Sequence, residues 1–354
     1  MQSRCGSLQC QDLDEKQLSS FEILPCLYQG KMSKRIVLAL PTPGCSLFRR
    51  LQGGCLHCGL FADGIINNST GKKELISQFA EKLNRLDFSD CPVLCIYTPG
   101  SFLDNKELDT DIRNNILLLA AKKKGVRKII FESLPRYITL KKIRDLKTLF
   151  PHLEIEIAVG LDTRNDLIRS VCINKNFSLK TFEKACCLLK DNEIPWSAFA
   201  LLKPPFLTEL EAITDAIQTA QYIFESGAEA VSIEPMAIQE HTFTWMLFQK
   251  TLYRPPWLWS IIEVIKNLPP GFEVRIGGMV VYPKTIQSAY NCSLCTREVW
   301  QKIQEFNLVQ DRNIFNNLDC DCKKKWADEL QTAGNPLLER INIILQDFDE
   351  TSPG

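Results

Sequence analysis

The stretch Pro41-Thr-Pro-Gly-Cys-Ser-Leu-Phe-Arg-Arg-Leu-Gln-Gly-Gly-Cys-Leu-His-Cys-Gly-Leu60 places three cysteines in one glycine-rich loop. Cys45, Cys55 and Cys58 have the spacing C-x9-C-x2-C, and the next cysteine is Cys91. A closed structural zinc or iron–sulfur site normally takes four protein ligands. Three local thiolates instead predict a [4Fe-4S] cluster that is held through three irons and leaves its fourth iron open to a small molecule.

The residues before this loop support a barrel enzyme. The apolar run Arg35–Leu40 reads as a buried strand that ends at Pro41. A strand that delivers reactive groups into the loop at its carboxyl end is typical of barrel enzymes. A structural zinc site with Cys91 and Cys95 is the alternative, but Cys95 lies in an apolar strand-like run, where free cysteines are commonly buried.

Length and composition set broad limits. The chain of 354 residues, with 45% hydrophobic and 24% charged residues, suits one barrel plus a smaller module. No apolar run approaches the 18 residues of a membrane span, and the N-terminus lacks the apolar core of a secretory signal. Fifteen cysteines then indicate reduced thiols in a cytoplasmic protein. Three histidines argue against a histidine-based triad or a histidine-rich metal centre.

The net charge of zero gives no general attraction to nucleic acid. Local basic runs, such as Arg49–Arg50, Lys122–Lys124 and Lys323–Lys325, permit RNA contact without demonstrating it, because such runs are more often solvated faces.

The middle of the chain alternates short apolar runs with amphipathic stretches. The expected strands are Arg35–Leu40, Val93–Tyr97, Lys128–Glu132, Glu154–Leu161, Ala198–Leu202 and Ala230–Glu234. The expected helices are Lys73–Leu86, Asp109–Lys124, Leu140–Leu149, Leu179–Lys190 and Thr208–Gly227. About six βα units predict an α/β fold with a parallel sheet, a (β/α)6-type partial TIM barrel. We expect an N-terminal extension over residues 1–30, the barrel over 31–285 and a cysteine-rich module with a tail over 286–354.

The C-terminal module carries a second set of thiols. Cys292 and Cys295 form a CxxC clip, and Cys320 and Cys322 form a CxC clip, on either side of the helical stretch Arg297–Phe306. Four thiolates in one small segment predict a structural Zn²⁺ site, and four incidental thiols are the alternative. The sequence assigns no role to Cys5, Cys10 or Cys26.

Polar and small residues follow the expected strands, where a barrel carries its site. Each acidic one alone is more simply a helix cap or loop group, but together they predict a polar pocket. His57 lies inside the CxxC clip, where it either stacks on a cofactor or is merely tolerated next to solvent. The candidate cofactor contacts are His57, Gly100, Ser101, Glu132, Gly160, Asp162, Arg169 and Lys203.

The cysteine loop after the first barrel strand resembles the radical S-adenosylmethionine (radical SAM) superfamily, and its long spacing resembles the branch that includes the Elongator catalytic subunit. Residues 35 to 330 are similar to the archaeosine-synthase radical SAM subunit family. The motifs that carry this resemblance are Gly53-Gly-Cys-Leu-His-Cys-Gly59, Gly100-Ser-Phe-Leu-Asp104, Val159-Gly-Leu-Asp-Thr163, Cys172-Ile-Asn-Lys175, Leu201-Leu-Lys-Pro-Pro-Phe206, Tyr253-Arg-Pro-Pro-Trp-Leu-Trp259 and the cysteine-rich end Cys292–Trp326.

The resemblance implies that S-adenosylmethionine binds the open iron and is cleaved after one electron arrives from a donor such as ferredoxin or flavodoxin. It implies a tRNA substrate whose deazaguanine already carries a lysine added by a partner subunit. Cleavage of a carbon–nitrogen bond in that lysine leaves the amidine of archaeosine, so the implied activity is that of a lyase. The candidate contacts named above then become contacts with S-adenosylmethionine.

One departure from the superfamily pattern stands beside this resemblance. Thr98-Pro-Gly-Ser101 replaces the usual GGE motif, so Gly100 and Ser101 offer mainly backbone groups. Two other functions remain open at the level of the sequence. The first is a radical SAM enzyme that acts on a different RNA or on a small molecule, and the second is a non-catalytic scaffold that carries metal.

Overall fold

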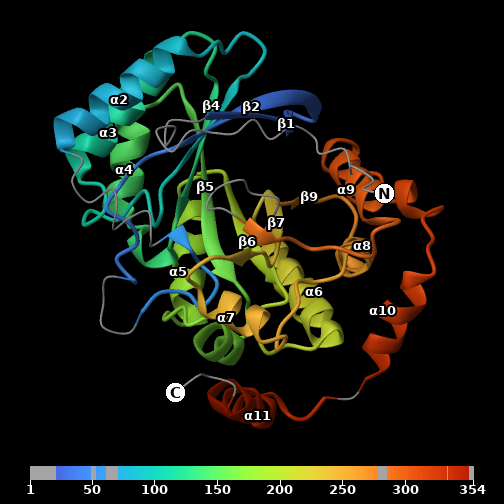
Figure 1. Ribbon diagram of the computed structural model, residues 1–354. Helices are drawn as coiled ribbons and strands as arrows, with labels where there is room; N and C mark the ends of the chain where they lie inside the picture. The colour runs from blue at the N-terminus through green and yellow to red at the C-terminus, as the bar shows by residue number, and fades with distance from the viewer. Residues whose placement is uncertain (1–20, 49–52, 61–70, 278–284, 333, 351–354) are drawn as a thin grey trace, which may run out of the picture.

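The structure is a computed structural model that describes residues 21–48, 53–60, 71–277, 285–332 and 334–350 (Figure 1). Cys5, Cys10 and the basic pair Arg49–Arg50 therefore lie outside the described residues. Within the described ranges, none of the helices combines the length and the apolar character that a membrane span requires.

A curled eight-stranded sheet forms the centre of the fold, with the strand order β1-β2-β3-β4-β5-β6-β7-β9. Strand β1 pairs with β2 in antiparallel fashion, and every other neighbouring pair is parallel. A separate two-stranded sheet pairs β8 with β10. The strands are β1 (Phe21–Tyr28), β2 (Lys31–Ala39), β3 (Val93–Tyr97), β4 (Lys128–Ser133), β5 (Glu154–Asp162), β6 (Trp196–Leu202), β7 (Ala230–Pro235), β8 (Ile238–Gln239), β9 (Glu273–Ile276) and β10 (Thr285–Gln287).

The partial barrel predicted from the sequence is confirmed, together with its six strands, because β2 to β7 correspond to the six expected apolar runs. Two strands of the sheet were not expected. Residues 21–28, which we placed in the N-terminal extension, form β1, and β9 adds an eighth strand beside β7. The signal for β1 is weak because its residues alternate between exposed and half-buried positions at the edge of the sheet.

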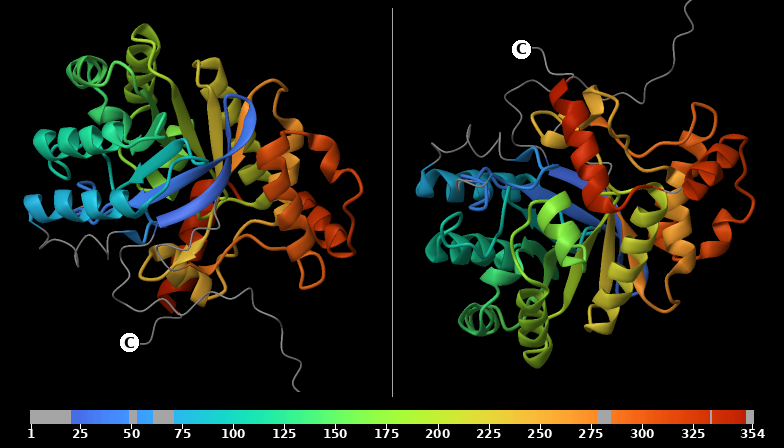
Figure 2. Two further views of the ribbon diagram at one scale, coloured as in Figure 1. Left: turned by 90° about the horizontal axis from the view of Figure 1, so that it is seen from above. Right: turned by 90° about the horizontal axis from the view of Figure 1, so that it is seen from below.

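Helices lie on the outside of the curled sheet (Figures 1 and 2). The five expected helices correspond to α2 to α6, and the helix expected at Arg297–Phe306 corresponds to α9. The helices are α2 (Lys72–Arg85), α3 (Thr110–Lys122), α4 (Leu140–Leu149), α5 (Leu179–Asp191), α6 (Glu209–Glu225), α7 (Phe243–Gln249), α8 (Leu258–Asn267), α9 (Thr296–Val309), α10 (Cys322–Gln331) and α11 (Leu337–Glu350), with short turns η1 (Pro135–Tyr137), η2 (Ile168–Cys172) and η3 (Arg312–Phe315).

The main core lies between the sheet and these helices. Alternate side chains of a strand point to opposite faces, so Leu94 and Ile129 join the outer core with Phe79 and Ile116. Their neighbours Cys95 and Ile130 belong to a separate small apolar cluster on the inner face of the sheet, with Val93 and Ala158. The side chains inside the barrel therefore form a cluster of their own, separate from the core between the sheet and the helices.

Strand β9, at one edge of the sheet, is closed by two amide side chains of helix α9. Asn307 accepts a hydrogen bond from the backbone N–H of Ile276 (2.7 Å) and donates one to its carbonyl oxygen (2.9 Å). Gln310 makes the same pair of bonds with Val274, at 2.9 Å each. Asn307 lies in the last turn of α9 and Gln310 is its C-cap residue, and their amides take the place of a ninth strand.

Charged side chains fill the inner face near the amino ends of the strands. Glu156 is fully buried, and its carboxylate contacts Lys128 (2.8 Å) and Arg275 (2.7 Å). Lys128 also pairs with Glu154, and Arg275 with Glu273. Burial opposes the ionisation of Glu156, but Arg275 and Lys128 outweigh it and lower the pKa of this carboxyl to about 2. We call these five residues the ionic layer.

Replacement of Glu156 by glutamine is expected to destabilise the fold by about 3–5 kcal/mol, because it leaves two buried cations without their shared anion. The wild type should keep the contribution of Glu156 above pH 4.5 and lose it as the pH falls toward 2, since the folded pKa lies below the ordinary value. Urea unfolding at pH 7 and pH 3 measures both effects. Glu154→Gln, at a partly exposed member of the layer, should cost under about 1 kcal/mol, and equal losses in the two variants would contradict the assignment.

Candidate active site

The cysteine loop begins directly after β2 and is tied to the loop after β3 by one buried carboxylate. Glu107 accepts hydrogen bonds from the Thr42 hydroxyl (2.8 Å) and from the backbone N–H of Ser101 (2.6 Å). A Cβ atom on Gly100 would stand 2.6 Å from the Cα atom of Cys45 and would also collide with the Glu107 carboxylate. Only glycine fits this position, so Gly100 and Ser101 lie against the loop as their position after a strand predicted. Glu107 was not predicted as a site residue, because it follows Ser101 in a loop that contains several other polar residues.

The second half of the cysteine loop is held by the segment that follows η2. The backbone N–H of Leu56 donates to the carbonyl of Ile173 (3.0 Å), and the Asn174 side chain donates to the carbonyl of Gly54 (2.9 Å). On the other side, Gln239 accepts a hydrogen bond from the N–H of Gly59 (2.7 Å). The loop that carries Cys55 and Cys58 is therefore fixed by residues far away in the sequence.

Charged residues converge beside this loop, at the carboxyl ends of β4 and β5. Lys175 forms an ion pair of 2.8 Å with Asp162. A Cβ atom on Gly160 would lie 3.0 Å from the Lys175 amino group and 3.4 Å from the Glu132 carboxylate. Asp162 has a φ of +69°, a left-handed conformation that is uncommon for residues other than glycine and concentrates at functional sites. The structure thus brings together three of the predicted contacts and adds Lys175.

The electrostatics of this pocket follow from burial. Burial raises the pKa of Glu132 to about 7, although Lys175 opposes the shift. Burial alone would lower the pKa of Lys175, but Asp162 and Cys55 raise it, so the lysine stays charged. The pocket therefore holds a permanent cation next to a carboxyl group that ionises near neutral pH.

The three thiols suit a cluster. Burial raises the pKa of each one, to about 12 for Cys58, and Lys175 opposes the shift in every case. Cys45 is among the groups that raise the pKa of both Cys55 and Cys58. Buried thiols of this kind give up their protons to iron rather than to water, and the nearby lysine offsets the resulting negative charge.

One ring nitrogen of His57 has no hydrogen-bond partner in the described part of the protein. Burial lowers the pKa of His57 to about 4, so the ring is neutral. Its Nδ1 atom is buried and lacks a hydrogen-bond partner among the described residues. Since a buried polar atom without a partner is costly, this nitrogen fits contact with a bound group.

Two predicted contacts are engaged by the protein itself. Arg169 is fully buried and donates to the carbonyl oxygens of Thr163 (2.6 Å) and Phe177 (3.1 Å). Lys203 pairs with Glu209 at 2.5 Å. Their direct contact with a cofactor stays a prediction. Arg169 also holds the segment that carries Lys175, because the backbone N–H of Lys175 donates to the carbonyl oxygen of Arg169 (2.9 Å).

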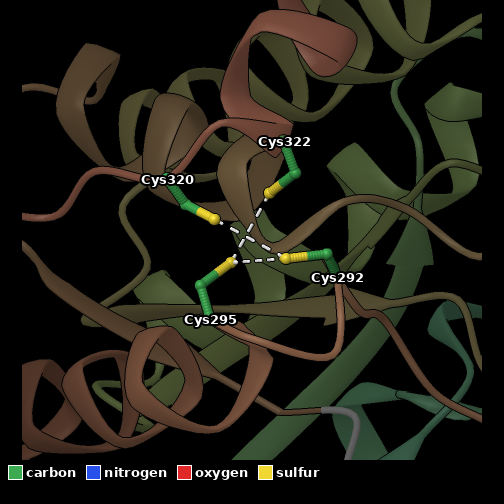
Figure 3. A group of neighbouring side chains, drawn as sticks. All are labelled: Cys292, Cys295, Cys320 and Cys322. Carbon is green, nitrogen blue, oxygen red and sulfur yellow. Dashed lines mark hydrogen bonds between the residues drawn. The ribbon is translucent and has the colours of Figure 1, made fainter.

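The four C-terminal cysteines meet between the end of β10 and the start of α10 (Figure 3). Their sulfur atoms all lie within 4.8 Å of one another, with closest pairs of 3.5, 3.6 and 3.7 Å. A disulfide needs about 2.0 Å. Tetrahedral zinc with Zn–S bonds of about 2.3 Å places sulfurs about 3.8 Å apart. The set fits one four-coordinate metal ion, although the predicted identity of that metal as zinc is not tested by these distances.

Neighbouring donors support thiolates at this centre. Trp259 donates its indole N–H to Cys322 (3.3 Å), and the Asn291 side chain donates to Cys295 (3.5 Å). Hydrogen bonds from the backbone N–H groups of Cys295 and Leu294 lower the pKa of Cys292 to about 6. Trp259 belongs to helix α8, and the Asn291 side chain accepts from the N–H of Leu258 at the start of the same helix (2.9 Å), so the metal centre is joined to α8.

The fold and the site together define a radical SAM protein. The fold is a partial α/β barrel, and three cysteines follow its first parallel strand beside a charged pocket at the strand ends.

Three relatives match most of the chain. An uncharacterized protein of Methanocaldococcus jannaschii is 31% identical over 328 residues, which are 89% of this chain and 87% of the relative. Two proteins named archaeosine synthase subunit beta are each 29% identical, one from Methanosarcina acetivorans (88% of this chain, 91% of the relative) and one from Thermococcus kodakarensis (84% and 92%).

The chain belongs to this family of radical SAM proteins, which includes the archaeosine synthase beta subunits. No family model matches it. Among solved structures, Methanocaldococcus infernus Elp3 aligns with a TM-score of 0.47 at 16% identity over 66% of this chain and 59% of that one, so the chain spans about three fifths of Elp3. Methylornithine synthase aligns with a TM-score of 0.44 at 10% identity over 82% and 85%.

Gly100→Ala is expected to lower the iron content after anaerobic reconstitution by more than half, because the added methyl group displaces Cys45 or Glu107. Zinc content should be unchanged, since the C-terminal thiols are remote in the fold. Iron and sulfide analysis measures the effect. Gly71→Ala, where an added Cβ meets nothing within 4 Å, is the matched control, and normal iron in Gly100→Ala would refute the close approach of the two loops.

The double variant Cys320→Ala/Cys322→Ala is expected to lose at least nine tenths of its bound zinc, because two of four ligands are gone. Metal analysis by mass spectrometry measures the loss, and Cys187→Ala, at an exposed cysteine, is the control. Undiminished zinc in the double variant would show that the four thiols do not hold it.

Proposed function

We propose that the protein is a radical SAM lyase of the archaeosine-synthase type, which cleaves a carbon–nitrogen bond in a lysine carried by a deazaguanine base of tRNA. Two observations support the proposal together: the cysteine loop with its charged pocket, and the two relatives named archaeosine synthase subunit beta, which match over nine tenths of their length. The word "subunit" in those names supports a partner subunit, which we propose adds the lysine.

We propose that Cys45, Cys55 and Cys58 would hold a [4Fe-4S] cluster and that S-adenosylmethionine would bind beside it. When bound, this pair supplies the one-electron cleavage that leads to removal of a hydrogen atom from the substrate. An external donor such as ferredoxin or flavodoxin provides the electron. The structural metal at the four C-terminal cysteines is proposed to be Zn²⁺.

The chain's own residues position and shield these groups. The backbone of Gly100 and Ser101, held by Glu107, faces the cysteine loop. The neutral ring of His57 offers its unpaired nitrogen to the cofactor. On the far side, the Asp162 side chain, held by Lys175, offers an oxygen that accepts from a ribose, and the missing side chain of Gly160 leaves space beside Glu132. Arg169 supports this wall, and Lys203 braces the loop after β6.

Exclusion of water is the second task of the site. His57, Cys55 and Glu132 are half-buried, and their partial removal from water disfavours their charged forms, as the direction of each pKa shift indicates. A water-poor site protects reactive groups from side reactions. The base of a tRNA reaches such a site only when it is turned out of its stack.

The proposal is tested by anaerobic reconstitution with iron and sulfide, followed by S-adenosylmethionine, dithionite and lysine-bearing tRNA. We expect 5′-deoxyadenosine and archaeosine-containing tRNA to form together. Cys58→Ala should reduce both to background while the chain stays folded and keeps its zinc, and Cys187→Ala should leave both unchanged.

Other outcomes point to other functions. Formation of 5′-deoxyadenosine with an unchanged tRNA would mean a radical SAM enzyme with a different RNA or small-molecule substrate. Normal turnover by Cys58→Ala would remove the cluster assignment. A fully loaded four-iron cluster that cleaves nothing, with or without tRNA and partner, would favour a metal-bearing scaffold.

A further inference from the structure

A cavity of about 100 Å³ lies inside the barrel, between the ionic layer and the mouth of the barrel. Residues from seven of the eight strands of the sheet line it, all except β5. At about 10–15 Å³ for each water-sized group, it has room for about seven to ten such groups. The site described above makes no use of this space.

One side of the cavity presents an arginine that the protein leaves without a partner. Arg35 points inward from β2, and its buried Nε atom has no hydrogen-bond acceptor among the described residues. No ion pair within 4.0 Å joins it to the described carboxylates, whereas Lys128 and Arg275, which line the same cavity, are both paired. Arg35 as a whole is half-buried, but its Nε atom is buried, and a buried donor without an acceptor is costly, so this position fits an anion that binds in the cavity.

The same cavity presents a carboxylate. Glu234, near the carboxyl end of β7, accepts a hydrogen bond from Ser232 (2.7 Å) and has no cation within ion-pair distance in the described chain. Gly277 packs its Cα atom against this carboxylate, and any Cβ atom there would collide with both oxygens. The Glu234 carboxylate is thus closely packed, and position 277 has room only for glycine. Burial raises the pKa of Glu234 to about 7. A cation bound beside this carboxylate would stabilise its charged form and lower the pKa again.

Tyr97 connects the cavity with the pocket at the mouth. It lines the cavity together with Phe199. Burial raises the pKa of Tyr97, and the charges that act on it include Arg35 on the cavity side and both Glu132 and Glu234 near the strand ends. An aliphatic chain that entered from the mouth would therefore pass two aromatic side chains before it met the charged groups.

We propose that this cavity binds the free α-amino acid end of the substrate, with its carboxylate on Arg35 and its ammonium group on Glu234. The inference rests on the proposed function. Cleavage in the lysine side chain that leaves an amidine means that the lysine is joined to the base through its side-chain nitrogen, so its α-amino and α-carboxylate groups are free. A guanidinium and a carboxylate on opposite walls match these two charges, and the arrangement discriminates against chains that lack either one.

The experiment compares three tRNAs in which the base carries lysine, 1,5-diaminopentane (no carboxylate) or 6-aminohexanoate (no α-amino group), each joined through the same nitrogen. Wild-type binding, measured anaerobically by fluorescence anisotropy, should weaken about 10–100-fold for each truncated group. Arg35→Met should bind the lysine form 10–100-fold more weakly and lose only its preference over diaminopentane. Glu234→Gln should lose only its preference over aminohexanoate.

Controls separate recognition from folding and from the cofactor. Gly277→Ala, which displaces the Glu234 carboxylate but leaves Arg35 intact, should behave like Glu234→Gln. Lys34→Met and Glu225→Gln, at exposed neighbours, should match the wild type. Iron, zinc and the affinity for S-adenosylmethionine should stay unchanged in every variant.

The outcomes distinguish this inference from the proposed function. If the wild type converts lysine-bearing tRNA but binds all three tRNAs equally, the inference is wrong and the function stands. If Arg35→Met or Glu234→Gln weakens S-adenosylmethionine while the preference among tRNAs persists, the cavity holds the methionine end of the cofactor instead. If the wild type neither binds nor converts lysine-bearing tRNA, the proposed function fails and the inference falls with it.

Discussion

The buried carboxylate of Glu107 determines where the reactive loop can lie. It binds one loop through the Thr42 hydroxyl and the next through the Ser101 N–H, and it leaves Gly100 against Cys45 with no space for a side chain. Burial raises the pKa of Glu107, and the donors from Ser101 and Thr42 oppose that shift, so the group depends on these bonds to stay an acceptor. The cysteine loop after β2 is thus held by the loop after β3. This contact restricts the loop more than its own glycine-rich sequence could.

The pairing of charges inside the barrel differs between the amino and the carboxyl ends of the strands. In the ionic layer the buried charges neutralise one another, and the small apolar cluster around Cys95 separates that layer from the mouth. At the mouth Lys175 is paired with Asp162 and Lys203 with Glu209, while Glu132 and Glu234 lack a cation within ion-pair distance among the described residues. A protein can retain such unpaired charges only where the rest of the fold supplies stability, and here the fully paired layer and the outer core do so.

Sequence patterns predicted the parts of this molecule that depend on local chemistry. The six parallel strands follow from continuous apolar runs, and the gathering of the four C-terminal cysteines follows from their spacing. The edge strands β1 and β9 were missed because half-exposed or short strands carry a weak signal. Glu107 and Lys175 were missed as site residues because their partners come from distant loops, which no local pattern encodes. Arg169 and Lys203 follow strands as the other candidates do, but buried partners of their own engage them.

The amide clamp of Asn307 and Gln310 on β9 has a consequence for how the chain can be divided. The expected boundary at residue 285 separates β9 from α9, yet these two elements share four hydrogen bonds that complete the sheet. Helix α9 begins at Cys295, its N-cap residue, which is also one of the four metal-binding candidates. The same helix therefore begins at the cysteine cluster and ends at the edge of the sheet. A chain cut at residue 285 would lose the two amides and leave the edge of β9 free to pair with another copy of the chain.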